Sequence, residues 1–188
     1  VAAVLLTAAI AAYLQHPLFG QLPGTERQAL WANSPNFANG IFVNQIDTPM
    51  STTDQSELTM WMETLSGPDG QPRPPRALPA IKTNLKALDI QQDLVIWLGH
   101  SSYYAQLGGL RILVDPVFST NAAPLPLVNT AFEGTSLYTA DDMPTIDLLL
   151  ITHDHYDHLD YPSMQALQPR VKRVVTGLGV GAHLDAWG

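Results

Sequence analysis

The sequence predicts an α/β fold, because apolar runs of strand length in its second half alternate with helical patterns. Each run is short and bounded by polar or turn residues, as strands of a sheet are, and most are rich in Leu, Ile and Val. Helices follow only after the later runs, near 163–167 and 179–187, which favours a sheet with helices packed against it. The strands are expected at 94–98, 103–107, 110–114, 146–151 and 171–175.

Local signals justify these elements in order. Gly108-Gly109 is typical of a tight hairpin turn between the second and third runs. Asp115-Pro116 ends the third run, and a long loop rich in Pro, Asn and Gly covers 118–144. The run 146–151 is apolar except for Asp147, which predicts a strand covered on both faces.

Composition narrows the possible chemistry. The 188 residues include 9 Lys and Arg against 17 Asp and Glu, a formal net charge of −8, and no cysteine. This acidic balance leaves no basic face for a nucleic-acid backbone, so we expect no nucleic-acid partner. The absence of cysteine excludes disulfides, thiolate zinc clusters and a cysteine nucleophile. Any catalysis must therefore use His, Asp, Glu, Ser or a metal.

The first residues differ in character from the rest. Segment 1–14 is apolar apart from Thr7, and the first charged residue is Glu26. Residues 1–16 are expected to be a signal sequence or membrane anchor, which places the protein at a membrane or outside the cytoplasm, in a bacterial cell envelope. The alternative is a buried Ala- and Leu-rich helix.

Residues 17–90 are interpreted as an irregular arm. Turn and polyproline signals recur through this stretch, including Pro23-Gly24 and Asn39-Gly40. Only 54–65 shows helical spacing of apolar residues, with Asp54 or Thr53 as a possible N-cap. Residues 91–188 are then the main domain.

A cluster of metal-ligating side chains follows the apolar run at 146–151. His153, His155, Asp157 and His158 lie in a loop at the carboxyl end of that strand, where α/β folds commonly bind ligands. His153 and His155 project to the same side of an extended backbone and can bind one cation. Imidazole and carboxylate ligands suit zinc, and also iron or manganese. The alternative is a solvated polar loop.

This cluster resembles the His-x-His-x-Asp-His signature of the metallo-β-lactamase superfamily. Three segments, 97–101, 114–119 and 153–160, further resemble the branch that contains the phospholipase D acting on N-acylphosphatidylethanolamine and its bacterial membrane-associated relatives. The resemblance implies an αββα sandwich with two metal ions, expected to be zinc. It also implies that His153 and His155 hold one metal, and that Asp157 and His158 hold the second.

The function implied is metal-dependent hydrolysis by a metal-bridged hydroxide, with Asp157 orienting the attacking water. A phosphodiesterase acting on a lipid-like substrate is the first expectation. A lactonase of the same superfamily and a non-catalytic, metal-binding half-domain are the alternatives. The sequence does not indicate an oligomeric state.

We also predict roles for four polar residues outside the motif. His100 follows the first strand and either contacts the metal ligands or substrate, or is a satisfied core histidine. Asp115 either orients a ligand imidazole or caps a turn. Asp160 is expected to be a helix N-cap, and His183 to serve packing.

Two metals need about six protein ligands, whereas the motif supplies four. Because the chain ends 30 residues after His158 (188 − 158 = 30), we expect it to be an amino-terminal part of a longer domain. Such a part would leave an apolar sheet face uncovered around Trp97, Ile112, Leu148 and Leu150, and would aggregate or pair with a partner.

Overall fold

A computed structural model describes residues 1–49, 54–56, 58–60, 62, 73–124 and 129–188. The chain forms two compact units. One unit combines residues 1–24 with residues 77–188, and the other comprises residues 25–76. The first unit contains the candidate site.

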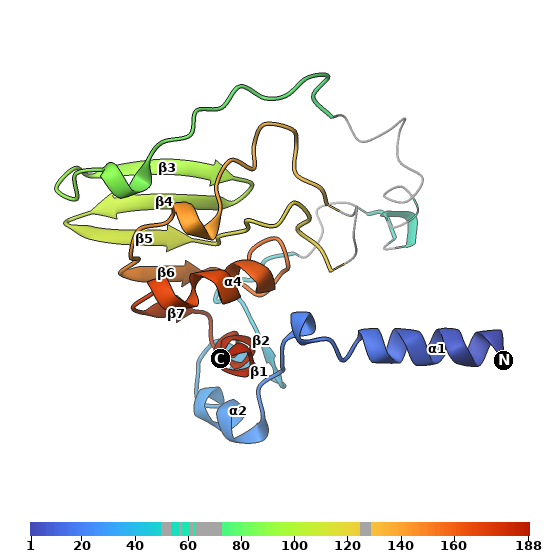
Figure 1. The fold of residues 1–188 in the computed structure, drawn as a ribbon. Helices are drawn as coiled ribbons and strands as arrows, with labels where there is room; N and C mark the ends of the chain where they lie inside the picture. Colours follow the sequence, from blue (N-terminus) through green and yellow to red (C-terminus); the bar gives the residue numbers. More distant parts are fainter. Residues whose placement is uncertain (50–53, 57, 61, 63–72, 125–128) are drawn as a thin grey trace. The chain divides into compact units, whose positions relative to one another are not determined.

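A five-stranded sheet forms the centre of the first unit (Figure 1). Its spatial order follows the sequence, β3-β4-β5-β6-β7. The first two pairings are antiparallel, and the pairings of β5 with β6 and of β6 with β7 are parallel. The strands are β3 (Leu94–Gly99), β4 (Ser102–Leu107), β5 (Leu110–Val114), β6 (Leu148–Ile151) and β7 (Val174–Thr176).

The mixed α/β fold expected from the sequence is confirmed, with two boundary corrections. Strand β6 begins at Leu148 and not at Ile146, because Ile146 forms only an isolated bridge with Val171. Strand β7 therefore begins at Val174, three residues later than expected. Asp147 explains the late start, because its carboxylate accepts a hydrogen bond from the backbone N–H of Arg111 and pairs with Lys172.

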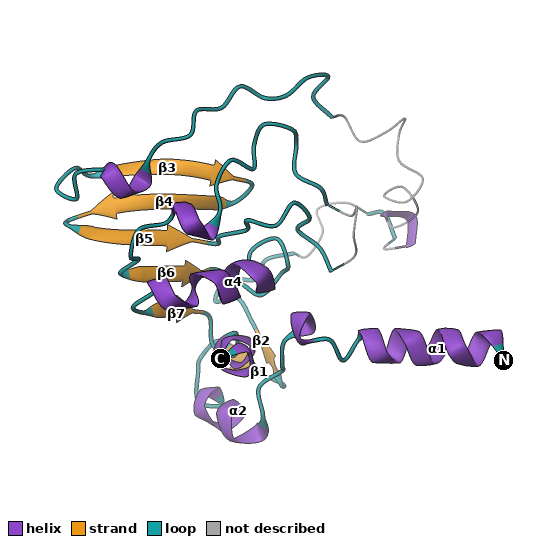
Figure 2. Cartoon of the chain, in the orientation of Figure 1, coloured by secondary structure: helices purple, strands orange, loops and turns teal. Residues whose placement is uncertain are grey.

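Short helices lie along the sheet and bury one of its faces (Figure 2). Alternate strand residues on that face, Tyr104, Leu113 and Leu149, are almost fully buried. Met164 and Leu167 of α4 join the same apolar core. The helical elements are η2 (Leu85–Ala87), η3 (Ala140–Asp142), α4 (Tyr161–Leu167), η4 (Gln168–Arg170) and α5 (Gly181–Trp187).

The opposite face of the sheet is apolar and partly exposed in the described part of the chain. Its side chains stand in rows across the strands, since the register aligns them. One row consists of Trp97, Tyr103, Val114, Leu150 and Val175. Trp97 is 59% exposed and Val175 48% exposed. Only one face of β6 is thus deeply buried, in contrast to the two covered faces that its sequence predicts; the expected self-association through the open face stays a prediction.

The N-terminal residues form helix α1 (Ala2–Tyr13), with no buried side chain, followed by the 3-10 turn η1 (Pro17–Phe19). Among the described residues, no helix has the length and apolar character needed to cross a membrane. The imidazole of His16 caps η1, because its Nδ1 accepts the N–H of Leu18 at 3.2 Å.

The second unit corrects the expectation of an irregular arm between residues 17 and 90. It contains helix α2 (Thr25–Trp31) and a hairpin of β1 (Phe37–Ala38) and β2 (Ile41–Phe42). Trp31, 5% exposed, packs on the rings of Phe37 and Phe42, so a small aromatic cluster organises the unit. In the helix expected at 54–65, residues 58–60 and 62 are helical, whereas residues 57, 61 and 63–65 lie outside the described residues.

Asp147 offers a test of how β6 is fixed. The hydrogen bond from Lys172, followed by that from the Arg111 backbone, holds the pKa of Asp147 below its usual range. Asp147→Asn keeps an oxygen for Arg111 but removes the charge. The ion pair is partly solvated, so we expect a loss of at most about 1 kcal/mol in the free energy of unfolding at pH 7.

Because the pKa is lowered on folding, this stabilisation exists above the pKa of the unfolded carboxyl, about 3.9. It is lost as the pH falls through the lower value of the folded protein. Urea unfolding at pH 7 and pH 3 measures both points. Asp141→Asn is the matched control, because Asp141 is 91% exposed in its pair with Arg170. An equal loss in the two variants at pH 7, or a loss that does not shrink at low pH, contradicts the prediction.

Candidate metal centre

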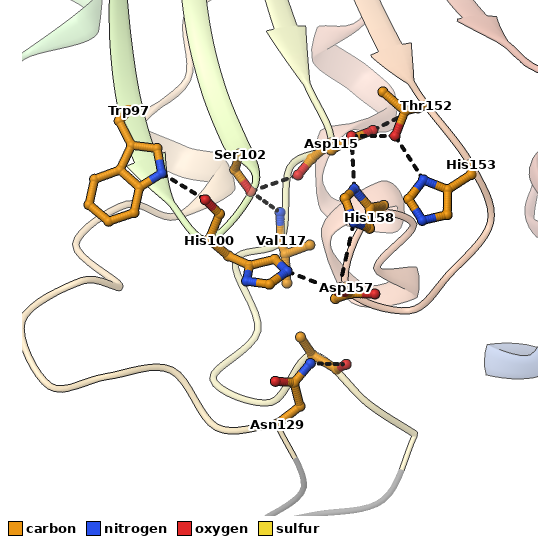
Figure 3. Close-up of polar contacts among 11 residues, drawn as sticks. Trp97, His100, Ser102, Asp115, Val117, Asn129, Thr152, His153, Asp157 and His158 are labelled. Carbon is orange, nitrogen blue, oxygen red and sulfur yellow. Dashed lines mark hydrogen bonds and ion pairs between the residues drawn. The ribbon is translucent and has the colours of Figure 1, made fainter. Parts of the chain in front are cut away.

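The candidate site lies at one edge of the sheet, where the carboxyl ends of three strands meet. Strands β3, β5 and β6 run in the same direction, since β4 is antiparallel to both of its neighbours. Three segments are therefore brought together: His100 after β3, Asp115 after β5, and the loop from Thr152 after β6 (Figure 3).

The loop after β6 turns back on itself so that its imidazoles gather. The N–H groups of His158 and Leu159 both donate to the carbonyl oxygen of His155, at 3.0 and 2.8 Å. Leu159 is 4% exposed and anchors the turn in the core. The ring centre of His153 lies 4.5 Å from that of His155 and 4.0 Å from that of His158. The three motif histidines thus form one cluster.

Asp157 lies between two imidazoles. Its Oδ2 is 3.0 Å from Nε2 of His100 and 3.7 Å from Nε2 of His158. One potential ligand atom from each of these three residues lies within 4.8 Å of the others. Zinc–nitrogen and zinc–oxygen bonds measure about 2.0 to 2.2 Å, so atoms at this mutual spacing can surround one cation. The site therefore has the donor chemistry that a metal of this class requires.

Asp115 supports this cluster through hydrogen bonds to Thr152 and His158. It is 2% exposed, and both of its carboxylate oxygens accept hydrogen bonds. Oδ1 accepts the backbone N–H of Thr152 at 2.8 Å. Oδ2 accepts the hydroxyl of Thr152 at 2.6 Å and Nδ1 of His158 at 2.9 Å. One buried carboxylate therefore joins the ends of β5 and β6.

The partners of Asp115 assign the protonation of two imidazoles. A carboxylate can only accept, so Nδ1 of His158 must carry a proton. The hydroxyl of Thr152 donates to Asp115, and its oxygen, 3.0 Å from Nδ1 of His153, is then an acceptor for a proton on that nitrogen. In the neutral form of both rings, Nε2 is therefore the nitrogen without a proton. Neutral imidazole with one free nitrogen is the form that binds metals.

Two residues at the sheet edge adopt left-handed backbone conformations. His100 has φ +46°, and Asp115 has φ +42°. Such angles are costly for residues other than glycine and persist where other contacts enforce them. The indole Nε1 of Trp97 donates to the carbonyl oxygen of His100 at 2.8 Å, and Ser102 donates its hydroxyl to the carbonyl oxygen of Asp115 at 2.6 Å (Figure 3). These bonds hold the two backbone turns.

The charge state of Asp157 follows from its neighbours. Partial burial acts to raise its pKa, but the hydrogen bond from His100 and a backbone hydrogen bond act in the opposite direction and outweigh that effect. The pKa of Asp157 is therefore lower than usual, and its carboxylate is ionised near neutral pH. An ionised carboxylate beside imidazole nitrogens is a suitable cation ligand and proton acceptor.

The remaining candidates have distinct positions. Asp160 caps helix α4 as expected, since its side chain accepts the N–H of Ser163. His183 is buried, at 9% exposure, and is not part of the cluster. Thr152 and Ser102 support the site but escaped the sequence reasoning. Only the position of Thr152 directly before the first motif histidine could have signalled its role.

Comparison with known proteins identifies the family. Residues 110–188 match the model of the beta-lactamase superfamily domain. This region of the chain, residues 110–188, belongs to that superfamily. The matched region includes Asp115 and the whole histidine cluster, so the superfamily assignment and the site geometry concern the same residues.

Two relatives and one solved structure are similar to parts of this chain. The chain is 34% identical over 162 residues to an uncharacterized protein of Mycobacterium tuberculosis, covering 86% of this chain and 44% of that protein. It is 33% identical over 100 residues to the N-acyl-phosphatidylethanolamine-hydrolyzing phospholipase D 1 of Caenorhabditis elegans, covering 47% and 27%. The structure of CmlA, a diiron beta-hydroxylase from Streptomyces venezuelae, shares 29% identity over 52% of this chain and 19% of its own, with a TM-score of 0.38.

The chain matches only part of the length of each relative. It spans about 44% of the length of the mycobacterial relative and 27% of the worm enzyme.

Removal of the Asp115 carboxylate tests its supporting role. Asp115→Ala removes a buried carboxylate that accepts three hydrogen bonds from Thr152 and His158, so we expect a loss of about 3 kcal/mol or more in the free energy of unfolding. Thr152→Val, the milder comparison, removes one hydroxyl and is expected to cost about 1 kcal/mol. Urea unfolding of the metal-free protein measures both. Equal, small losses in the two variants would show that the carboxylate supports nothing beyond its own turn.

Proposed function

We propose that this chain carries the metal-binding part of a metal-dependent hydrolase. The observation that supports the proposal most strongly is the convergence of His153, His155 and His158 on one side of a loop, with Asp157 beside them. A solvated polar loop, the alternative left open by the sequence, has no need of a buried carboxylate that fixes two imidazoles in their metal-binding form.

The motif residues divide into two pairs in this proposal. His153 and His155 hold one cation, and Asp157 and His158 hold a second. Zinc is the preferred metal, with iron or manganese compatible with the same nitrogen and oxygen donors. Metal ions of this kind supply a water of lowered pKa and polarise the bond to be broken.

The protein groups have separate tasks. Asp157 is the proposed group that orients the attacking water and accepts a proton from it, since its carboxylate is ionised and can accept hydrogen bonds. His100 contacts Oδ2 of Asp157 and limits the rotation of that carboxylate. Asp115 and Thr152 hold the Nδ1 side of His158 and His153, which would leave Nε2 of each ring available to a cation.

The substrate proposed is a phosphodiester in a lipid-like molecule. Two observations support it: the likeness to the worm phospholipase D, and an apolar helix α1 whose side chains are all exposed. We further propose that α1 associates with a membrane and that the protein resides in the cell envelope or is exported. An exposed apolar helix next to the catalytic unit would bring the site to the surface where such substrates reside.

Metal analysis tests the site directly. The complete gene product, purified and loaded with zinc, is expected to hold two ions per chain. His153→Ala with His155→Ala should remove one ion, and Asp157→Asn with His158→Ala should remove the other. Asp141→Asn is the control, because Asp141 is 91% exposed in its pair with Arg170 and lies outside the motif. If both double variants retain two tightly held ions, the assignment of ligands is wrong.

A substrate comparison tests the reaction. The complete gene product is expected to hydrolyse a long-chain phosphodiester at least about tenfold faster, in kcat/KM, than a lactone of similar size. Asp157→Asn should reduce kcat by about 10² to 10⁴, the usual contribution of a proton-transferring group. Preference for the lactone would redirect the proposal to a lactonase. Absence of turnover on both substrates in a fully metal-loaded protein would favour a non-catalytic metal-binding domain.

A further inference from the structure

A buried histidine outside the metal cluster joins two distant parts of the first unit. His183 lies in α5 and is 9% exposed. Its Nδ1 accepts the backbone N–H of Gln21 at 3.1 Å, across 162 residues of sequence. A histidine that only fills space would not need a polar partner from so distant a segment.

The same hydrogen bond determines which nitrogen of the neutral ring carries the proton. Because Nδ1 accepts, the proton of the neutral ring must be on Nε2. Nε2 lies 3.5 Å from Oδ2 of Asp154. Asp154 stands between His153 and His155 in the metal-binding loop. His183 is thus placed between the N-terminal segment and the loop that carries the proposed ligands.

Further contacts make the N-terminal segment fit this position. Gly20 has φ +64°, and a Cβ built on it would lie 1.9 Å from Nδ1 of His183, so only glycine allows the approach. The indole Nε1 of Trp187, one turn beyond His183, donates to the carbonyl oxygen of Pro17 at 2.7 Å. The ring of Phe19 meets that of Tyr156, also in the metal-binding loop, edge to face with centres 6.1 Å apart.

We propose that His183 is a positioning residue that clamps the segment 17–21 against the metal-binding loop. Its Nδ1 holds Gln21, its Nε2 faces Asp154, and Gly20 provides the space for the ring. Phe19 then packs against Tyr156 and forms part of the loop's support. The consequence for metal binding rests on the proposed function, whereas the clamp itself does not.

Amide exchange at Gln21 tests the clamp, because its N–H is the donor to His183. Measured by NMR on the metal-free protein, His183→Leu is expected to accelerate exchange of this amide by about tenfold or more. His183→Asn is expected to restore most of the protection, since an amide oxygen can replace Nδ1 as acceptor. Gly20→Ala should accelerate exchange as His183→Leu does, although its histidine is intact.

Three results decide the matter. If His183→Leu leaves Gln21 as protected as in the wild type, or if asparagine restores nothing, His183 serves packing alone and the clamp is overturned. If His183→Leu does not fold, the exchange of Gln21 in Gly20→Ala decides instead, with unchanged protection overturning the proposal. Asp141→Asn, in an exposed pair with Arg170 outside the clamp, is the control that should leave Gln21 protected.

Cobalt titration separates the clamp from the proposed function. With the clamp and the metal site both correct, His183→Leu weakens cobalt binding by about tenfold, and His183→Asn less. If no variant and no wild-type protein binds cobalt, the metal proposal fails while the Gln21 result still stands. If cobalt binds equally to all variants although Gln21 exchange rises in His183→Leu, the clamp holds the N-terminal segment but does not position the loop, and that part of the proposal is wrong.

Discussion

The arrangement of the candidate site depends on the buried carboxylate of Asp115. A charge taken out of water is costly unless hydrogen bonds compensate it, and this carboxylate receives three, from the N–H and hydroxyl of Thr152 and from His158. These donors are available only if β5 and β6 end side by side in parallel. The need to satisfy one buried group therefore fixes the strand register, the start of the loop and the orientation of two imidazoles together.

The loop carrying the motif is held at several points around this centre. Leu159 enters the core at its far end, and Asp160 accepts from Ser119 and Ser163. On its outer side Asp154 and Tyr156 meet His183 and Phe19. A ligand set supported in this way needs little rearrangement when a cation binds, which is the condition for tight and geometrically defined binding. The ionised Asp157 adds the negative charge that attracts the cation.

The sequence was sufficient to predict the sheet and the motif, because both follow from local patterns. The strands β3 to β6 follow from short runs of residues in the sequence, and the turn between β4 and β5 follows from the pair Gly108-Gly109. The start of β6 could not be predicted, because it depends on Asp147 meeting Arg111 and Lys172 across the sheet. Helix α2 was missed because it is short and is stabilised by Trp31 packing on a hairpin, a contact that helical periodicity does not report.

In the site as well, residues close in sequence could be predicted, whereas contacts between residues distant in sequence could not. Spacing alone identified His153, His155, Asp157 and His158 as neighbours. Spacing could not decide between the two roles considered for Asp115, and it could not reveal Thr152 as the link to His153. Both roles depend on the pairing of two strands that are distant in sequence. The partner of His183 lies 162 residues away, so no local pattern could distinguish it from a packing histidine.

The tautomers of His153 and His158 test the central claim most directly. Long-range proton–nitrogen NMR spectra of the metal-free protein at neutral pH report which ring nitrogen carries the proton in each histidine. The hydrogen bonds to Asp115 and Thr152 require a protonated Nδ1 and a free Nε2 in both rings. Spectra showing the proton on Nε2, or a rapid average of the two forms, would contradict the account, because the carboxylate would then not be directing these rings toward a metal.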